Sequence, residues 1–185
     1  MRNLLLFLAA LAASPPVSAQ NSWQENGRTA TPDPSRSSRD GFAAMMLVTD
    51  DSEAFWRAWD GPTPPQLPTT SRAVRNQPVN GMVIFSGCAA GPDGNCDVTA
   101  EFVFLRPDGS RYGESLRGDL WKGPPAPGPT LRLGTGSAAL IVEPGDPMGV
   151  WTIRARVTDN VRGVTLQIEQ RVTVDTPPAP ATNAA

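Results

Sequence analysis

Proline placement constrains the fold of this chain more than any other feature of its sequence. The 185 residues include 20 prolines, and a proline inside a helix or a central strand removes a backbone donor and disrupts the element. Strands and helices are therefore expected in the intervals between prolines. Because many prolines crowd into the short segments 62–68, 124–129 and 177–180, long proline-free intervals remain. We predict an ordered body from about Gly41 to Asp175.

Within the proline-free intervals, apolar residues recur mostly at every second position, which is the period of a half-buried strand. Trp151, Ile153, Ala155 and Val157 are the clearest example. The turn at 159–163 predicts that the strands on either side of it pair as an antiparallel hairpin. The expected strands are residues 81–87, 98–104, 111–121, 131–142, 150–158 and 164–174. This pattern predicts an all-β fold, an antiparallel β-sandwich, with a small barrel as the alternative.

The N-terminal part of the body differs from the rest. An apolar run at Phe42–Thr49 predicts a strand, and Ser52–Trp59 follows an acidic cap and predicts a short helix. A proline-rich connector comes next. We therefore divide the body into an N-terminal strand, helix and connector at 41–70, which form an appendage, and a sandwich at 71–175.

Both ends of the chain are expected to lie outside the ordered body. Residues 1–19 have the positive start, short apolar stretch and small-residue cleavage site of a secretory signal peptide. The polar segment 20–40 and the Pro/Ala segment 176–185 are predicted to be a disordered leader and tail. The protein is thus expected to be periplasmic or secreted, with no membrane insertion after signal cleavage.

The two cysteines, Cys88 and Cys96, are expected to form a disulfide bond, because an exported protein meets an oxidising environment. Between them, Asp93, Asn95 and Asp97 alternate as the first ligands of a calcium loop do. The glycine and the closing glutamate of that motif are missing, so we favour a simple turn and keep these three residues as weak calcium candidates. No other metal and no cofactor is predicted.

The chain contains no histidine. It therefore lacks the imidazole needed for a Ser-His-Asp triad, a Cys-His pair or a histidine zinc site. Carboxylate chemistry stays available, since glycoside hydrolysis needs only two acidic side chains. The acidic residues that could serve are Glu101, Glu114, Asp119, Glu143 and Asp146. No spacing selects a pair among them, and we predict that the protein is not an enzyme, with a carboxylate-based hydrolase as the alternative.

Residues 143–159 resemble the corner and following strand of immunoglobulin-like domains in bacterial secreted and periplasmic proteins. In those domains an Asp, a Gly and an aromatic residue precede alternating small and apolar residues. Asp146, Gly149 and Trp151 occupy these positions, with Trp151 where tyrosine is common. The resemblance implies an immunoglobulin-like sandwich, although such a fold does not define a function.

Binding to another envelope or secreted protein is the function that we expect. Edge strands of a sandwich offer backbone donors and acceptors to an incoming strand. The alternative is a carbohydrate-binding module, because tryptophan faces stack on sugar rings, and Trp56, Trp121 and the neighbouring Lys122 are the candidate binding residues. Nucleic acid is not an expected partner, since the net charge is −2 and the basic residues do not cluster.

Overall fold

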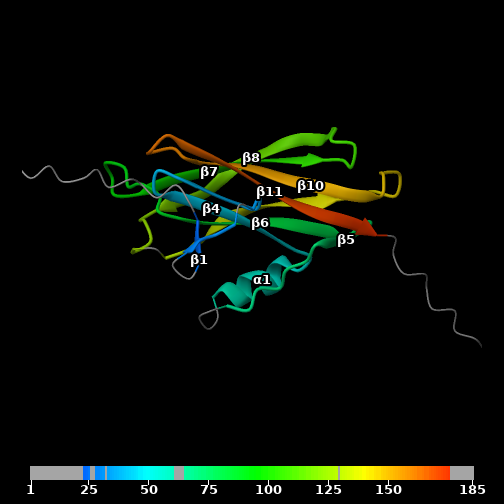
Figure 1. The fold of residues 1–185 in the computed structure, drawn as a ribbon, viewed down its shortest axis with the longest axis horizontal. Coiled ribbons are helices and arrows are strands. Elements are labelled where there is room, and N and C mark those ends of the chain that lie inside the picture. The colour runs from blue at the N-terminus through cyan, green and yellow to red at the C-terminus, as the bar shows by residue number, and fades with distance from the viewer. Residues whose placement is uncertain (1–22, 26–27, 32, 61–64, 129, 176–185) are drawn as a thin grey trace, which may run out of the picture.

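A computed structural model describes the body of the chain as two stacked β-sheets with one helix on the outside (Figure 1). The described residues are 23–25, 28–31, 33–60, 65–128 and 130–175. The signal peptide and the C-terminal tail that the sequence predicts lie outside these residues. The elements are β1 (Gln24–Glu25), β2 (Arg28–Thr29), β3 (Arg36–Arg39), β4 (Phe42–Thr49), α1 (Ser52–Trp59), β5 (Arg72–Val74), β6 (Pro78–Ser86), β7 (Cys96–Leu105), β8 (Arg111–Gly123), β9 (Arg132–Ile141), β10 (Gly149–Asp159) and β11 (Val164–Asp175).

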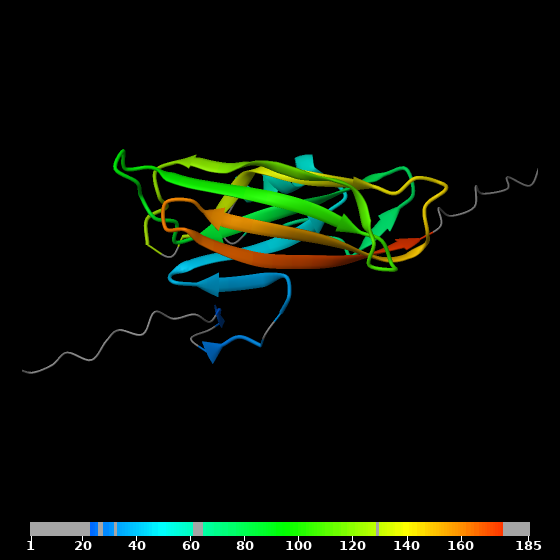
Figure 2. The same cartoon turned by 90° about the horizontal axis from the view of Figure 1, so that it is seen from above.

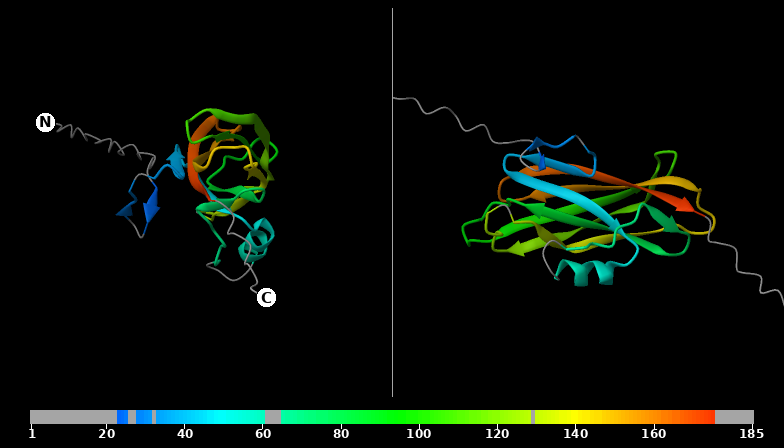
Figure 3. Two further views of the ribbon diagram at one scale, coloured as in Figure 1. Left: turned by 90° about the vertical axis from the view of Figure 1, so that its right-hand side faces the viewer. Right: turned by 60° about the horizontal axis from the view of Figure 1, so that its bottom comes forward.

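The two sheets have four and five strands. The four-stranded sheet has the order β3-β4-β6-β9, and the five-stranded sheet has the order β5-β11-β10-β7-β8. Strand β5 runs parallel to β11, whereas the other pairs are antiparallel. Figures 2 and 3 show the two layers from above and from the end. The predicted all-β sandwich is confirmed, and the barrel alternative is not adopted.

The main core lies between the sheets and consists of the alternating apolar side chains that the sequence pattern predicted. Trp151, Ile153, Ala155 and Val157 of β10 are fully buried. The Trp151 indole packs edge-on against the Tyr112 ring, with 5.0 Å between centroids, and its Nε1 donates to the carbonyl of Pro147 at 3.0 Å. These contacts seat the start of β10 in the core.

A second apolar cluster lies on the outer face of the four-stranded sheet, beneath α1. Phe55 of the helix packs there on Met82 and Ile84 of β6 and on Leu133 of β9. Since Val83 and Phe85 of β6 face the main core, this strand is buried on both faces. The helix thus explains why the apolar run at 82–85 is continuous and does not alternate with polar residues.

The prediction of a disordered leader at 20–40 is wrong for its last part, because β3 forms there and pairs with β4. The turn between the two strands is Asp40-Gly41, with φ of 53° and 80°, the sequence and geometry of a tight hairpin turn. Strand β4 lies between β3 and β6 inside the sheet. The boundary expected after residue 70 therefore does not separate an appendage from the sandwich.

The turn between β10 and β11 ties the two sheets together at one end. The buried carboxylate of Asp159 accepts hydrogen bonds from the backbone N–H groups of Ala89, at 2.8 Å, and of Arg162, at 3.1 Å. The Arg162 guanidinium donates to the carbonyls of Asp40 and Gly87 at 2.7 and 3.0 Å. One short turn thus holds the β3–β4 turn and the end of β6.

Candidate functional site

The two long sides of the sandwich, where an edge of one sheet meets an edge of the other, are built differently. On one side β11 meets β3, β4 and the connector that follows α1, and we call this the closed side. Backbone N–H groups of β11 donate to chain segments across it, from Glu169 to Pro34 at 2.7 Å and from Thr173 to Ser71 at 2.8 Å. The connector also bonds β4, through Thr70 N–H and the Val48 carbonyl at 2.8 Å. Backbone hydrogen bonds thus close this side of the sandwich.

On the opposite side, which we call the open side, β8 meets β9 mainly through side chains. The Thr135 hydroxyl donates to the Leu120 carbonyl at 3.0 Å, and the Tyr112 hydroxyl donates to the Ile141 carbonyl at 3.3 Å. The Arg132 guanidinium lies 3.9 Å from the centroid of the Trp121 ring. In the described part of the chain no backbone hydrogen bond joins β8 to β9. These side-chain contacts lie near the two ends of the length over which β8 and β9 run side by side. Between them the backbone groups of the two edges are not paired with each other.

Between these side-chain contacts lies a small gap of about 100 Å³. Its lining residues are Phe102, Leu116, Arg117, Gly118, Asp119, Leu120, Gly136 and Ser137. Leu116 stands opposite the buried Phe102 in the β7–β8 register, and directly opposed residues lie on the same face of a sheet. Leu116 therefore points toward the core, yet 47% of it is exposed. An inward-facing leucine left half-exposed shows that, among the described residues, no segment covers this part of β8.

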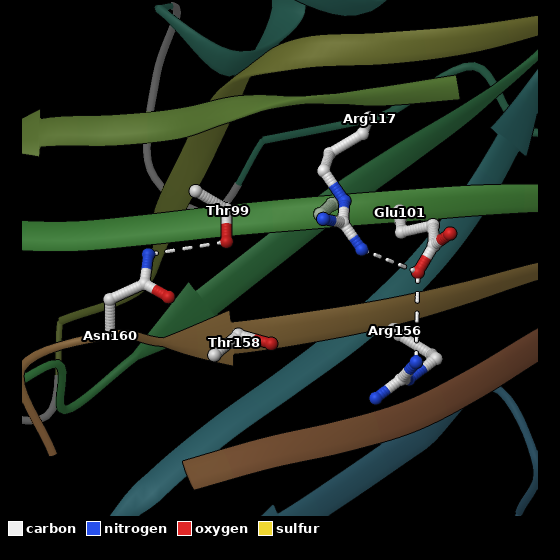
Figure 4. A pocket seen from close by; sticks show the side chains of 7 residues that line it. Thr99, Glu101, Arg117, Arg156, Thr158 and Asn160 are labelled. Atoms are coloured by element: carbon white, nitrogen blue, oxygen red, sulfur yellow. Dashed lines mark hydrogen bonds and ion pairs between the residues drawn. The ribbon is translucent and has the colours of Figure 1, made fainter. Parts of the chain in front are cut away.

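A second hollow, of about 320 Å³, lies on the outer face of the five-stranded sheet. Figure 4 shows its polar lining, which consists of Thr99, Glu101, Arg117, Arg156, Thr158 and Asn160. Glu101 Oε2 accepts a hydrogen bond from Arg117 Nη2 at 3.1 Å and lies 3.6 Å from Arg156 Nη1. Hydrogen bonds from Arg117 and Ser115, followed by the charges of Arg117 and Arg156, lower the pKa of Glu101. Glu101 is thus a fixed anion held between two cations.

Arg117 borders both hollows. Its side chain is 73% exposed, and in the register it stands opposite Glu101 on the outer face, next to the inward-facing Leu116. The open edge of β8 therefore offers an apolar side chain toward the core and a cationic one toward the outer face, at neighbouring positions. We take residues 115–119 of β8, with the two hollows, as the candidate functional site.

The tryptophans predicted from the sequence lie in different surroundings. Trp56 is half-buried and packs against the cluster beneath α1. Trp121 is half-buried at the end of β8, with its Nε1 donating to the Pro124 carbonyl at 3.2 Å and Arg132 stacked on its ring. Lys122 Nζ lies 3.5 Å from Asp119 Oδ2. Trp121 and Lys122 thus adjoin the open side, whereas Trp56 belongs to a separate cluster.

The predicted disulfide between Cys88 and Cys96 is present, with 5.9 Å between the Cα atoms. It closes the loop between β6 of one sheet and β7 of the other. Inside that loop both carboxylate oxygens of Asp93 accept hydrogen bonds from Asn95, at 3.0 Å each. These hydrogen bonds lower the pKa of Asp93. Asp97 Oδ1 accepts from Asn160 at 3.0 Å.

In the part of the chain that the structure describes, no three Cys, Asp or Glu side chains lie close enough to hold a metal ion. The carboxylates considered for catalysis are spread over β7, β8 and the turn before β10. Across the same residues no helix is long and apolar enough to span a membrane.

Comparison with known proteins gives little beyond the fold. No family model matches the sequence, and no curated protein matches it. One similar solved structure is a family 123 glycoside hydrolase from Clostridium perfringens, with 8% identity and a TM-score of 0.43, covering 74% of this chain. The chain spans only 28% of the length of that hydrolase. Another is a CARDB domain from Pyrococcus furiosus, solved in complex with di-metal ions, with 15% identity and a TM-score of 0.34 over 57% of this chain and 80% of that one. At these values neither likeness carries an argument about function.

Proposed function

We propose that this chain is an exported, non-catalytic binding module of the bacterial envelope, and that it binds another protein along the open side of its sandwich. The observation that carries the proposal is Leu116, which points toward the core from an unpaired edge strand and is nevertheless 47% exposed. Edge strands expose unpaired N–H and C=O groups that pair readily with an incoming chain. Addition of a partner's strand to β8 would pair those groups and cover Leu116.

We further propose that the sandwich is of the immunoglobulin-like kind. Its strand order supports this, because β4, β6 and β9 form one sheet while β7, β10 and β11 form the other, as strands A, B, E and C, F, G do in immunoglobulin domains. The indole of Trp151 donates to the carbonyl of Pro147, four residues upstream. The tyrosine-corner hydroxyl of such domains makes an equivalent bond near the start of strand F.

A protein partner is favoured over a sugar because the tryptophans are already engaged. Stacking on a sugar ring needs a free aromatic face, but Arg132 lies 3.9 Å from the centroid of Trp121. Trp56 packs into the cluster beneath the helix. The edge of β8, by contrast, offers backbone groups, an apolar side chain and a charged side chain in a row.

The non-catalytic part of the proposal rests on the acidic side chains. Glu101 lies between two arginines and has a lowered pKa, so it does not hold a proton near neutral pH as a general acid must. Asp119 lies beside Lys122. Turnover by a pair of carboxylates requires one with a raised pKa, whereas that of Glu101 is lowered.

Export is supported by the disulfide bond, since such bonds persist in oxidising compartments. N-terminal sequencing of the protein recovered from the periplasm or the medium is expected to begin at Gln20. Protein that begins at Met1 would contradict this part of the proposal.

The docking surface is tested by photo-crosslinking in the cell. A photoreactive side chain at position 116 is expected to give a discrete adduct with another protein. The matched control is position 150, because Val150 is also an exposed apolar residue of a strand, at 47%, but does not line the open side. Equal adducts from both positions, or none from position 116, would contradict the proposal. A glycan-array signal that Trp56→Ala or Trp121→Ala abolishes would favour carbohydrate binding instead.

A further inference from the structure

We infer that the segment bound at the open side is an extended strand with an apolar side chain opposite Leu116 and an acidic side chain beside it, opposite Arg117. This inference rests on the proposed function and names the chemistry of the partner. It follows from the alternation of β8 and from the charges on either side of Arg117.

The first step is the alternation of the strand. Leu116 stands opposite Phe102 and Arg117 stands opposite Glu101 in the β7–β8 register. Because Phe102 is buried and Glu101 lies on the outer face, these two neighbours on β8 point to opposite faces. Directly opposed residues of paired strands share a face. A strand added to β8 would therefore place one side chain over the gap beside Leu116 and the next beside Arg117.

The gap favours an apolar side chain of modest size. Its volume is about 100 Å³, and its wall includes Phe102 and Leu120, which are buried, as well as Leu116. Gly118 leaves one wall open, since a Cβ built there would have no atom within 4 Å. A branched aliphatic side chain entering from the edge would remove the exposed part of Leu116 from water.

The charges favour an acidic side chain on the outer face. Glu101 is shared by Arg117 and Arg156, at 3.1 and 3.6 Å, so two guanidiniums share one carboxylate. The nearby Asp119 is itself paired with Lys122. A carboxylate from the partner would give Arg117, which is on the edge strand, an anion that it does not have to share. The Arg117 side chain is 73% exposed, whereas that of Glu101 is 23% exposed. Ion pairs near the protein surface contribute little to stability, so Arg117 can exchange partners at small cost.

The occupant is therefore neither a uniformly apolar nor a basic segment. A basic residue at the outer position would face Arg117, and like charges directly opposed across a sheet are destabilising. The recognition element that the site fits is a short β-strand in which an aliphatic residue is followed or preceded by Asp or Glu.

The test uses two synthetic peptides that differ at one position. Both alternate valine and threonine, and at one central outward-facing position one carries aspartate and the other lysine. Binding of fluorescent forms to the full mature chain is measured for the wild type, Arg117→Glu and Arg171→Glu. The last variant is the matched control. Arg171 is an exposed arginine of β11, three strands away from β8 in the same sheet, and its substitution changes the net charge equally.

We expect the wild type to prefer the acidic peptide by up to about fivefold, the upper value for one cross-strand charge pair. The preference should reverse in Arg117→Glu and persist in Arg171→Glu. Equal melting temperatures of the three proteins would show that Arg117→Glu is folded.

The other outcomes separate this inference from the proposed function. If both peptides bind equally and both reduce the adduct formed at position 116, the open side binds strands without reading charge, and this inference is overturned while the proposed function stands. If neither peptide binds while the adduct at position 116 forms, the acidic strand is the wrong partner chemistry. If neither peptide binds and position 116 gives no adduct, both are overturned.

Discussion

The closed and open sides of the sandwich carry out the same structural task by different means. On the closed side, backbone groups of Pro34 and Ser71 accept hydrogen bonds from β11, and Gln170 Nε2 reaches the Met46 carbonyl at 3.1 Å. On the open side, the contacts between β8 and β9 come from the side chains of Tyr112, Arg132 and Thr135. Backbone hydrogen bonds therefore close the first side, whereas side-chain contacts join the strands on the second.

The difference comes from the segments before and after β4. Strand β3 and the connector from α1 to β5 both lie against β11, and without them the edge of β11 would be as open as that of β8. In the described ranges, the segments that follow β8 and β9 make no backbone hydrogen bond to the edge of β8. An edge left unguarded risks aggregation unless it carries charges or irregularities. Strand β8 has both, with Arg117 and Asp119 on its outer face and two register shifts against β7. The edge is therefore protected without being covered.

The largest expected contrast comes from one substitution made on each side. Leu166 of β11 is 3% exposed and Leu116 of β8 is 47% exposed. Leu166→Ala should lower the free energy of unfolding by about 2–5 kcal/mol, since it leaves a cavity in a packed core. Leu116→Ala should cost less than about 1 kcal/mol, because much of its surface is already in water. Urea unfolding measures both changes. Equal losses of unfolding free energy would contradict the difference between the two sides.

The disulfide gives the next largest effect. Cys88 and Cys96 are 8 positions apart and join the strands, β6 and β7, that lie next to β9 and β8. Replacing both by serine should lower the free energy of unfolding by about 2.5 kcal/mol, since the closed loop is short. Urea unfolding with and without a reductant measures this effect. The double variant should not respond to the reductant, and an intact protein that loses nothing on reduction would contradict the prediction.

A single hydrogen bond across the open side gives a smaller effect. Thr135→Val keeps the shape of the side chain but removes the donor to the Leu120 carbonyl, at a cost of about 1 kcal/mol. Because side-chain contacts join β8 to β9, amide hydrogen exchange in β8 of this variant should become faster while exchange in β11 stays the same. Equal acceleration in both strands would indicate that the two sides do not open separately.

The smallest effect on stability at neutral pH concerns Tyr112, whose hydroxyl joins β8 to β9 at the other end of the open side. Burial, followed by the hydrogen bond and charge of Asp146 and the charge of Glu143, raises the pKa of Tyr112 to about 12. The raised pKa means that folding favours the neutral phenol. The resulting stabilisation is fully present below pH about 10, the unfolded value, and is lost as the pH rises through 12.

Tyr112 is the single tyrosine of the chain, so ultraviolet absorbance follows its ionisation alone. Asp146→Asn should move the midpoint down toward the ordinary value. A midpoint near pH 10 in the wild type, while circular dichroism still reports a folded protein, would show that Tyr112 is not buried between β8 and β9 in solution.

The sequence predicts most of the strands because their burial is one-sided. Phe42–Thr49 and Ser52–Trp59 are found with the expected bounds, and the alternation of β10 predicts its buried face. Strand β3 was missed because Arg36–Arg39 is polar throughout. Its available signal was the Asp40-Gly41 pair, a typical hairpin turn. Strand β5 has only three residues and too few positions to show a period.

The candidate site could not be predicted in the same way. Residues 111–121 alternate weakly and are interrupted by Gly118, so the sequence predicts only a weak strand there. The structure gives the physical reason, since an edge strand that lacks a covering neighbour is exposed on both faces and its sequence need not alternate. Which edge would be sealed depends on contacts such as that between Glu169 and Pro34, and these join residues far apart in the sequence. The edge-strand argument for protein binding stays a prediction, as do the roles of Trp56 and Trp121.

The turn at Asp159 and Arg162 also bears on the order in which the chain folds. The β10–β11 hairpin is continuous in sequence, and hairpins of this kind form within microseconds. The hydrogen bonds of its tip to Ala89, Gly87 and Asp40 span 70, 75 and 122 positions, and contacts at such separations form slowly. The hairpin can therefore form early, but the Asp159 carboxylate and the Arg162 guanidinium at its tip stay hydrated until these distant segments reach them. Completion of the native state is expected to coincide with the arrival of these segments at the hairpin tip.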